Sequence, residues 1–230
     1  MFDILFCHSD FIVINKHPHV SVHKDDGDTM LLQEVARSLD GKPLYLIHRL
    51  DKMTSGILLL ARNKKAASEL SQLFAERKVA KFYLAIGSKK PKKKQGLVKG
   101  DMERSRRSAW KLLNTQSNPA ITQFFSASAE PGERLFICKP FTGKTHQIRV
   151  ALKSIGSPIV GDTIYNPSCQ ASRGYLHAFA IMFDFQGESF RFVCDPRDWA
   201  SDKEKWHQMS VSEGIQTWLS PWDLPWPTIK

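Results

Sequence analysis

The sequence predicts an α+β fold with a largely antiparallel sheet. The chain has 230 residues, 42% of them hydrophobic, which is enough for one well-cored domain. Many short apolar runs are rich in β-branched and aromatic residues, whereas few stretches have a helical period. The predicted strands and helices follow one another in an irregular order, which is typical of α+β proteins.

The first eighty residues supply strands with two helices between them. Residues 2–23 are expected to form a strand, centred on "FIVINK", and then a loop rich in turn formers. A short helix capped by Asp28 or Thr29 should run to Leu39, where Asp40 and Gly41 end it. The runs "YLIHRLD", "GILLLAR" and "AKFYLAIG" have the composition of strands.

Asn63 is the expected cap of a second helix that runs to about Arg77. The inward face of this helix is expected to carry Ala66, Leu70, Leu73 and Phe74.

A strongly basic segment, 88–107, interrupts this pattern with lysines, arginines, proline and glycine. Its composition predicts an exposed insertion loop that could clamp a phosphate backbone, although a solvated loop without a ligand fits equally well. The cationic candidates for such a clamp include Lys92, Lys93 and Lys94.

The second half predicts strands at "AWKLL", "ITQFFSASA", "RLFICKP", "GYLHAFAIMFDF" and "SFRFVCD". An amphipathic helix should begin at Thr145, with an apolar stripe that ends near Gly156. The tail, 201–230, is rich in tryptophan and proline. We expect it to pack on the body of the protein, with stacking on nucleic-acid bases as the alternative.

The charge balance indicates an anionic partner. The formal net charge is +10, which suits a nucleic acid or an acidic membrane surface, although it could serve solubility alone. No apolar run is long enough to span a membrane, and the N-terminus lacks the pattern of a signal peptide. Four scattered cysteines without a CxxC pair favour reduced thiols, so we expect a cytoplasmic protein.

One face of the helix that follows "TGKT" carries His146, Arg149 and Lys153. Free backbone N–H groups at a helix N-terminus favour anions, so a phosphate or carboxylate could bind there. Cys138 stands where a Walker A loop needs glycine, which argues against a nucleoside triphosphatase. The alternative is a solvated basic helix face.

The stretch "HRLDKMTSG" places His48, Arg49 and Asp51 between apolar runs. Partial burial of the aspartate would demand a charged partner, and Arg49 and Arg149 are the candidates. A carboxylate held ionised by arginine is a competent nucleophile or base. From these residues alone, a catalytic loop and a structural turn are both reasonable interpretations.

Four motifs, in the same order along the chain, resemble those of the RluA-like pseudouridine synthases. They are "HRLDKMTSG", "AKFYLAIG", "FTGKTHQIRVALKSIGSPIVGDTIY" and "GYLHAFAIMFDF", and they cover most of residues 10–195. The resemblance implies a pseudouridine synthase fold, an extended and mostly antiparallel sheet with a cleft across its middle. It further implies an isomerase that converts uridine in RNA to pseudouridine without a cofactor.

The resemblance also implies roles for individual residues. Asp51 would be the catalytic nucleophile, attacking C6 of the base or C1′ of the ribose, and Arg149 would pair with it and keep it ionised. Tyr83 would lie against the target base and take the proton from its C5. Arg49 would help fill the space left by the extruded nucleotide, and His48 could hold the loop in shape.

We expect RNA contacts from basic side chains around these motifs and in the lysine-rich segment. They are His48, Arg49, Lys144, His146, Lys153, Lys92, Lys93 and Lys94.

The whole chain, 1–230, is expected to be one catalytic domain, because there is no room for the small N-terminal RNA-binding domain of many relatives. The implied partner is structured RNA, tRNA or rRNA. Neither a membrane nor an obligate protein partner is expected, so the protein should be a monomer.

Two departures from the family pattern stand out. His17 and His19 replace the usual proline and glycine in "KHPHVSVH", and Lys144 replaces an arginine, which loses bidentate phosphate geometry. A metal site formed by His17, His19 and His23 is not supported by the surrounding residues.

Two other functions compete with this interpretation. One is an RNA-binding protein that has the same fold without activity. The other is a glycoside-cleaving enzyme that pairs Asp51 with a second acid such as Asp162.

Overall fold

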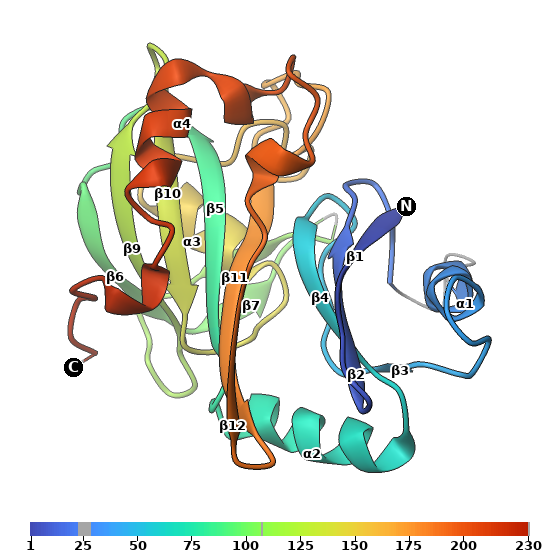
Figure 1. The fold of residues 1–230 in the computed structure, drawn as a ribbon. Coiled ribbons are helices and arrows are strands. Elements are labelled where there is room, and N and C mark those ends of the chain that lie inside the picture. Colours follow the sequence, from blue (N-terminus) through green and yellow to red (C-terminus); the bar gives the residue numbers. More distant parts are fainter. Residues whose placement is uncertain (23–28, 107, 230) are drawn as a thin grey trace.

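The computed structural model describes residues 1–22, 29–106 and 108–229. Its centre is a large mixed sheet, seen nearly edge-on in Figure 1. In spatial order its strands are β1 (Phe2–Cys7), β2 (Phe11–Lys16), β4 (Ser55–Ala61), β11 (Leu176–Phe185), β5 (Ala80–Ser88), β10 (Glu133–Pro140), β9 (Ala120–Ser128) and β6 (Gln95–Gly100). Two more strands join at the side, β3 (Tyr45–Leu46) on β4 and β12 (Glu188–Val193) on β11. A separate hairpin consists of β7 (Met102–Arg104) and β8 (Trp110–Leu112).

Neighbouring strands of the sheet are antiparallel except β4 and β11, which run parallel. The described α-helices are α1 (Thr29–Arg37), α2 (Lys64–Ala75), α3 (Gln147–Ser154) and α4 (Met209–Gln216). The predicted α+β fold with a largely antiparallel mixed sheet is therefore confirmed. None of the helices in the described ranges combines the length and apolar character needed to cross a membrane.

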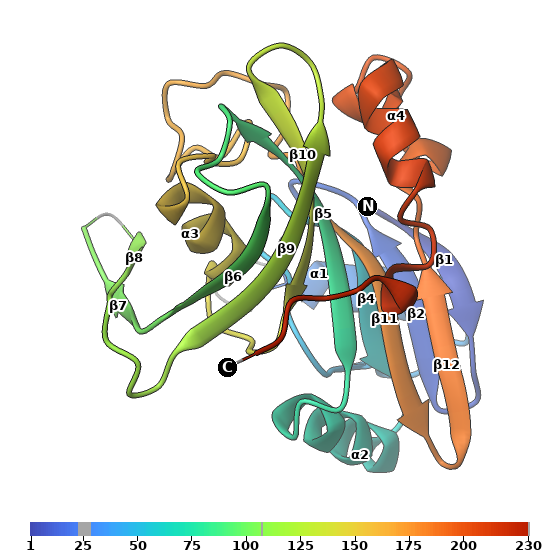
Figure 2. The same cartoon turned by 90° about the vertical axis from the view of Figure 1, so that its left-hand side faces the viewer.

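Strand alternation separates two apolar layers on the β5–β10 half of the sheet. On β5, Phe82 and Leu84 face the layer that contains α4 and the tail, whereas Ala85 faces the layer that contains α3. Figure 2 shows α3 and α4 on opposite sides of these strands. Tyr83 packs on the α3 side, so this face of the sheet carries the candidate chemistry.

Local signals predicted some elements correctly. Asn63 caps α2 as predicted, because its side chain accepts a hydrogen bond from the Ala66 backbone N–H at 2.9 Å. Ala66 and Leu70 are buried, while Leu73 and Phe74 are partly buried against the same core.

Other element boundaries were wrong. Two strands, β1 and β2, occupy the region where one was expected, and α1 ends at Arg37 instead of Leu39. The suggested cap Asp28 lies outside the described residues. The predicted helix from Thr145 begins only at Gln147, although Gly156 adopts the expected left-handed backbone with φ +86°.

The strand expected at "YLIHRLD" stops after Leu46, where the chain leaves the sheet. The strand ends here because a side chain takes the place of the backbone carbonyl that would otherwise pair with β4. The Nε2 atom of His48 accepts the hydrogen bond from the Leu59 N–H of β4 at 3.0 Å. The chain is therefore free to leave β4 and form the loop that carries Asp51.

The basic segment 88–107 is not one long loop. Residues 89–94 form an exposed connection, except for the buried Pro91, and β6 then pairs with β9 through six residues. Val98 is buried on β6, an apolar position that the surrounding lysines conceal in the sequence. Position 107 lies outside the described residues.

The tryptophan-rich tail packs on the body, as expected. Trp206 is fully buried and Trp218 nearly so, in the layer between the sheet and α4. Trp226 packs against Phe125 with ring centroids 5.1 Å apart. This packing accounts for the buried apolar residues of the tail.

A buried polar network fixes the junction of β4 and β11 directly behind the loop of Asp51. The Ser55 hydroxyl lies 2.7 Å from Nδ1 of His177, whose Nε2 lies 2.8 Å from the Cys194 carbonyl. Arg173 donates to the same hydroxyl at 2.5 Å. Gly56 has φ +103°, and a Cβ there would lie 2.3 Å from the Ala178 carbonyl oxygen, so only glycine fits.

We expect the fold to lose stability in acid because His177 is buried in its neutral form. Burial lowers its pKa from 6.5 to about 3, so the folded protein holds it neutral. In the unfolded chain it titrates near pH 6.5, so between about pH 6.5 and 3 the unfolded state binds the extra proton. The free energy of unfolding should therefore fall as the pH falls through this window, by up to about 1.4 kcal/mol per pH unit.

Urea unfolding of the wild type and of His177→Gln between pH 7 and pH 4 checks this expectation. The variant should have a lower stability at pH 7 but a shallower pH dependence. His19→Gln, which removes an exposed histidine, is the matched control and should keep the wild-type slope. Equal slopes for wild type and His177→Gln would contradict the prediction.

Candidate active site

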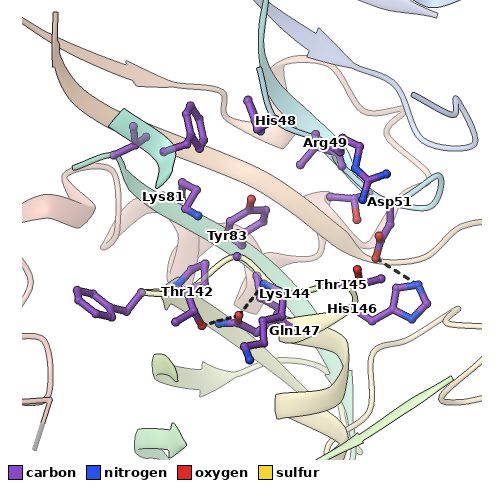
Figure 3. A pocket seen from close by; sticks show the side chains of 18 of the residues that line it. His48, Arg49, Asp51, Lys81, Tyr83, Thr142, Lys144, Thr145, His146 and Gln147 are labelled. Atoms are coloured by element: carbon purple, nitrogen blue, oxygen red, sulfur yellow. Dashed lines mark hydrogen bonds and ion pairs between the residues drawn. The ribbon is translucent and has the colours of Figure 1, made fainter. Parts of the chain in front are cut away.

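A cleft of about 700 Å³ opens on the α3 face of the sheet. Four segments line it: the loop before β4, the end of α2, strand β5, and the loop that leads into α3 (Figure 3). These segments are distant in the sequence, and the sheet brings them together. The cleft contains Asp51, Tyr83 and Arg149, the three residues predicted to be catalytic.

Asp51 lies in a turn that is closed by a hydrogen bond from the Thr54 N–H to the Asp51 carbonyl, at 2.9 Å. Its side chain is 26% exposed. One carboxylate oxygen, Oδ2, accepts a hydrogen bond from Nη1 of Arg149 at 3.0 Å. The other oxygen, Oδ1, makes no hydrogen bond within the described part of the chain, so it is available to a substrate.

Arg149 also forms an ion pair with a second carboxylate, that of Asp162. Asp162 is fully buried and accepts from Nε and Nη2 of Arg149 at 2.7 and 2.8 Å. Burial disfavours the charge on Arg149, but its bonds to Asp162 and then to Asp51 outweigh burial and raise its pKa. The guanidinium is therefore a fixed positive charge beneath Asp51.

Asp162 is in turn oriented by the backbone. Its Oδ1 also accepts the N–H groups of Ile164 and Tyr165, both at 3.0 Å. With no exposure and every bond directed at Arg149 or the backbone, it cannot serve as the second acid of a glycoside-cleaving enzyme. The geometry therefore excludes Asp162, the example of a second acid that the sequence offered for that rival interpretation.

His146 also approaches Asp51, with its Nε2 atom 4.0 Å from Oδ2 (Figure 3). It precedes α3 and adopts a left-handed backbone with φ +58°. Its Nδ1 atom lies 2.9 Å from the Tyr165 hydroxyl. Burial, assisted by the charge of Arg149, lowers the pKa of His146 below its ordinary value.

Tyr83 and Lys81 are two residues apart on β5 and both line the cleft. Burial, and secondarily the charge of Asp51, raises the pKa of Tyr83, so the phenol stays protonated at neutral pH. Burial lowers the pKa of Lys81, whose ammonium lies 5.8 Å from the centre of the Phe74 ring. Lys81 was not among the predicted site residues, although its two-residue spacing from Tyr83 places it on the same strand face.

His48 and Arg49 also line the cleft, from the loop opposite β5. The ring of His48 stacks on Phe74 with centroids 4.6 Å apart. Burial, and secondarily the charge of Lys81, lowers the pKa of His48 to about 3, so the ring is neutral. As expected, His48 shapes the chain at this point, through its bond to the β4 backbone.

Gln147 organises the loop that enters α3. Its side-chain oxygen accepts from the Thr142 hydroxyl at 2.7 Å and from the Lys144 N–H at 3.0 Å. Its amide nitrogen donates to the Ile121 carbonyl at 3.0 Å. The Lys144 ammonium donates to the Asn118 carbonyl at the edge of the cleft.

The remaining predicted basic residues lie outside the cleft. Lys153 is exposed, with its ammonium 5.4 Å from the centre of the Tyr165 ring. The exposed side chains of Lys92, Lys93 and Lys94 belong to the connection before β6. The Lys92 N–H bonds the Ile155 carbonyl at 2.9 Å, so this segment lies beside the end of α3.

The histidines of the N-terminal segment have separate partners. His17 contacts Asp3 at 2.6 Å and His19 contacts the Ser172 carbonyl at 3.2 Å. His23 lies outside the described residues.

Comparison with known proteins identifies the family of this chain. A model of the RNA pseudouridylate synthases matches residues 10–154. An uncharacterized RNA pseudouridine synthase of Haemophilus influenzae is 49% identical, over 95% of this chain and 96% of the relative. A ribosomal large subunit pseudouridine synthase C of Pasteurella multocida is 32% identical, over 82% of this chain and 62% of that relative.

A solved structure agrees with these sequence matches. The protein titled human RNA pseudouridylate synthase domain containing 1 has a TM-score of 0.77 at 26% identity, covering 96% of this chain and 95% of that one. The fold, the four motifs and the relatives thus all indicate the same family. The chain belongs to the RNA pseudouridylate synthase family, and it is an RNA pseudouridine synthase.

Proposed function

We propose that this synthase isomerises specific uridines of ribosomal or transfer RNA, with Asp51 as the nucleophile. The observation that carries the proposal is the ion pair at 3.0 Å between Asp51 and Arg149 inside the cleft that also holds Tyr83. A guanidinium beside a carboxylate stabilises its charged, nucleophilic form. The intact pair disfavours the alternative of an inactive RNA-binding protein.

The reaction begins when the target uridine leaves its stack and enters the cleft, at a cost of a few kcal/mol. Oδ1 of Asp51 then attacks, because Oδ2 is occupied by Arg149. Attack at C6 of the base and attack at C1′ of the ribose both start from this oxygen. The glycosidic bond between N1 and C1′ breaks, the uracil turns within the cleft, and C5 bonds to C1′. The bond between Asp51 and carbon then breaks again, the hydrogen on C5 leaves as a proton, and N1 takes up a proton.

Tyr83 is proposed to contact the base during this rotation. A phenol whose pKa is raised is a weak base at neutral pH, so the electrostatics favour packing and hydrogen bonding over proton removal from C5. His48 and Arg49 would line the entry of the nucleotide. Lys144 and Lys153 would add positive charge near α3, and the ring of His146 would contact the RNA as a neutral hydrogen-bonding group.

Ribosomal RNA is the substrate to test first, because four relatives above 30% identity are named for the large ribosomal subunit. We propose that residues 1–230 act as one monomeric catalytic unit in the cytoplasm, where such RNA is found. The exposed lysines of 89–94 would supply phosphate contacts next to the cleft.

Asp51→Asn should abolish isomerisation and leave RNA affinity within about threefold, because the phosphate contacts lie elsewhere. Tritium release from [5-³H]uridine-labelled total RNA, prepared from cells that lack this protein, measures turnover, and filter binding measures affinity. Asp202→Asn, an exposed carboxylate outside the cleft, is the control and should stay active. Appreciable turnover by Asp51→Asn would remove Asp51 from its proposed role.

Replacing Lys89, Lys90, Lys92, Lys93 and Lys94 by glutamine should weaken RNA binding and flatten its salt dependence. The slope of log K against log salt should become shallower by about 0.7 to 0.9 for each phosphate that these lysines neutralise in the wild type. Lys64→Gln with Lys65→Gln, at the exposed start of α2, is the charge control. Unchanged affinity and slope in the five-lysine variant would show that the segment is a solvated connection.

A further inference from the structure

A chain of two hydrogen bonds leads from the β7–β8 hairpin to the candidate nucleophile. The Trp110 N–H of β8 donates to the Tyr165 hydroxyl at 2.8 Å. The same hydroxyl lies 2.9 Å from Nδ1 of His146. Tyr165 is only 3% exposed, so solvent does not compete for these bonds.

The direction of the bonds fixes the position of a proton. A backbone N–H can only donate, so the Tyr165 oxygen is the acceptor of the bond from Trp110. The phenolic hydrogen then needs an acceptor of its own, and Nδ1 of His146 is its partner among the described residues. If Nδ1 donated instead, the phenolic hydrogen would have no acceptor among the described residues, so the arrangement that satisfies both groups has His146 accepting at Nδ1 and, as a neutral ring, carrying its hydrogen on Nε2.

That Nε2–H group faces Asp51. It lies 4.0 Å from Oδ2, the same oxygen that accepts from Arg149, and makes no hydrogen bond to another residue within the described ranges. Hydrogen bonds at reacting groups are often long in the free enzyme and shorten when substrate binds. The left-handed backbone of His146, unusual for a residue with a side chain, holds the ring in this place.

One turn supplies both supports of the nucleophile. Asp162 accepts hydrogen bonds from Arg149, and Tyr165, three residues later, hydrogen-bonds to His146. The two are tied together, because the Tyr165 N–H donates to Asp162. Both supported groups converge on Oδ2 and leave Oδ1 open.

We propose that Tyr165 is a positioning residue that acts through His146. By donating to Nδ1 it keeps the hydrogen of His146 on Nε2, where it supports Oδ2 of Asp51 and orients Oδ1 toward the substrate. The proposal rests on the proposed role of Asp51 as the nucleophile. It assigns Tyr165 no contact with RNA.

Tyr165→Phe tests the proton position directly. The variant keeps the ring that packs under Arg149 and removes only the hydroxyl. In ¹⁵N spectra of histidine-labelled protein at pH 7.5, wild-type His146 should have its hydrogen on Nε2, and the variant should show a mixture of tautomers. A wild-type hydrogen on Nδ1, or an unchanged tautomer in the variant, overturns the proposal whether or not the enzyme turns over RNA.

Kinetics on the labelled total RNA described above test the consequence. Tyr165→Phe should lower kcat about tenfold with KM unchanged. His146→Gln, which keeps an N–H near the position of Nε2, should retain more activity than His146→Asn. Equal kcat in Tyr165→Phe and wild type, or a change confined to KM, would contradict the positioning role.

Tyr175→Phe is the matched control. It removes another buried tyrosine hydroxyl that accepts a backbone N–H, here from Lys205 at 3.2 Å, outside the cleft. Its thermal stability should fall as much as that of Tyr165→Phe, while kcat and the His146 tautomer remain as in the wild type. A similar loss of kcat in both variants would mean that the Tyr165 hydroxyl affects activity only through protein stability, which would contradict the proposal. If wild-type protein releases no tritium, the proposed function fails, and the tautomer result still decides this proposal.

Discussion

One guanidinium shared by two carboxylates is the interaction on which this site depends. Arg149 is 4% exposed and places one edge on the fully buried Asp162 and another atom on Asp51. A buried charge without a partner is strongly unfavourable, so Asp162 is what allows arginine to occupy this position. The guanidinium that faces Asp51 in the cleft is therefore held in one orientation by Asp162.

The sheet explains how residues 98 positions apart form this pair. Asp51 lies in the loop that leads into β4, which runs parallel to the neighbouring β11, and β5 lies on the other side of β11. Tyr83 leaves β5 on the face that α3 covers, and α3 carries Arg149 to the same face. Gly56 and the buried bonds of Ser55 fix the β4–β11 junction, so the loop of Asp51 has a rigid base.

The sequence predicted the features that local chemistry determines. A cap and an apolar stripe were enough for α2, and the four motifs were enough for the fold, the family and the residues that meet in the cleft. The strand β6 was missed because lysines hide its buried Val98. The early end of β3 was missed because the ring of His48 takes the place of a backbone acceptor, which no propensity describes.

The supports of the site were harder to predict, because they depend on tertiary contacts. The sequence indicates Asp162 only as a possible second acid, whereas its burial against Arg149 gives it a structural role. Tyr165 ends one of the four motifs without a role implied for it, and the only signal for Lys81 was its spacing from Tyr83. Each becomes visible only when the sheet brings its neighbours together.

The most direct test of this account measures the consequence of releasing Arg149 from its buried partner. Asp162→Asn preserves shape and removes one charge, so the guanidinium should lose its fixed orientation while the cleft persists. The account predicts a fall in kcat of at least a hundredfold on labelled RNA, with binding nearly unchanged and Arg149 displaced in a crystal structure of the variant. A folded variant whose kcat stays within threefold of the wild type would contradict it.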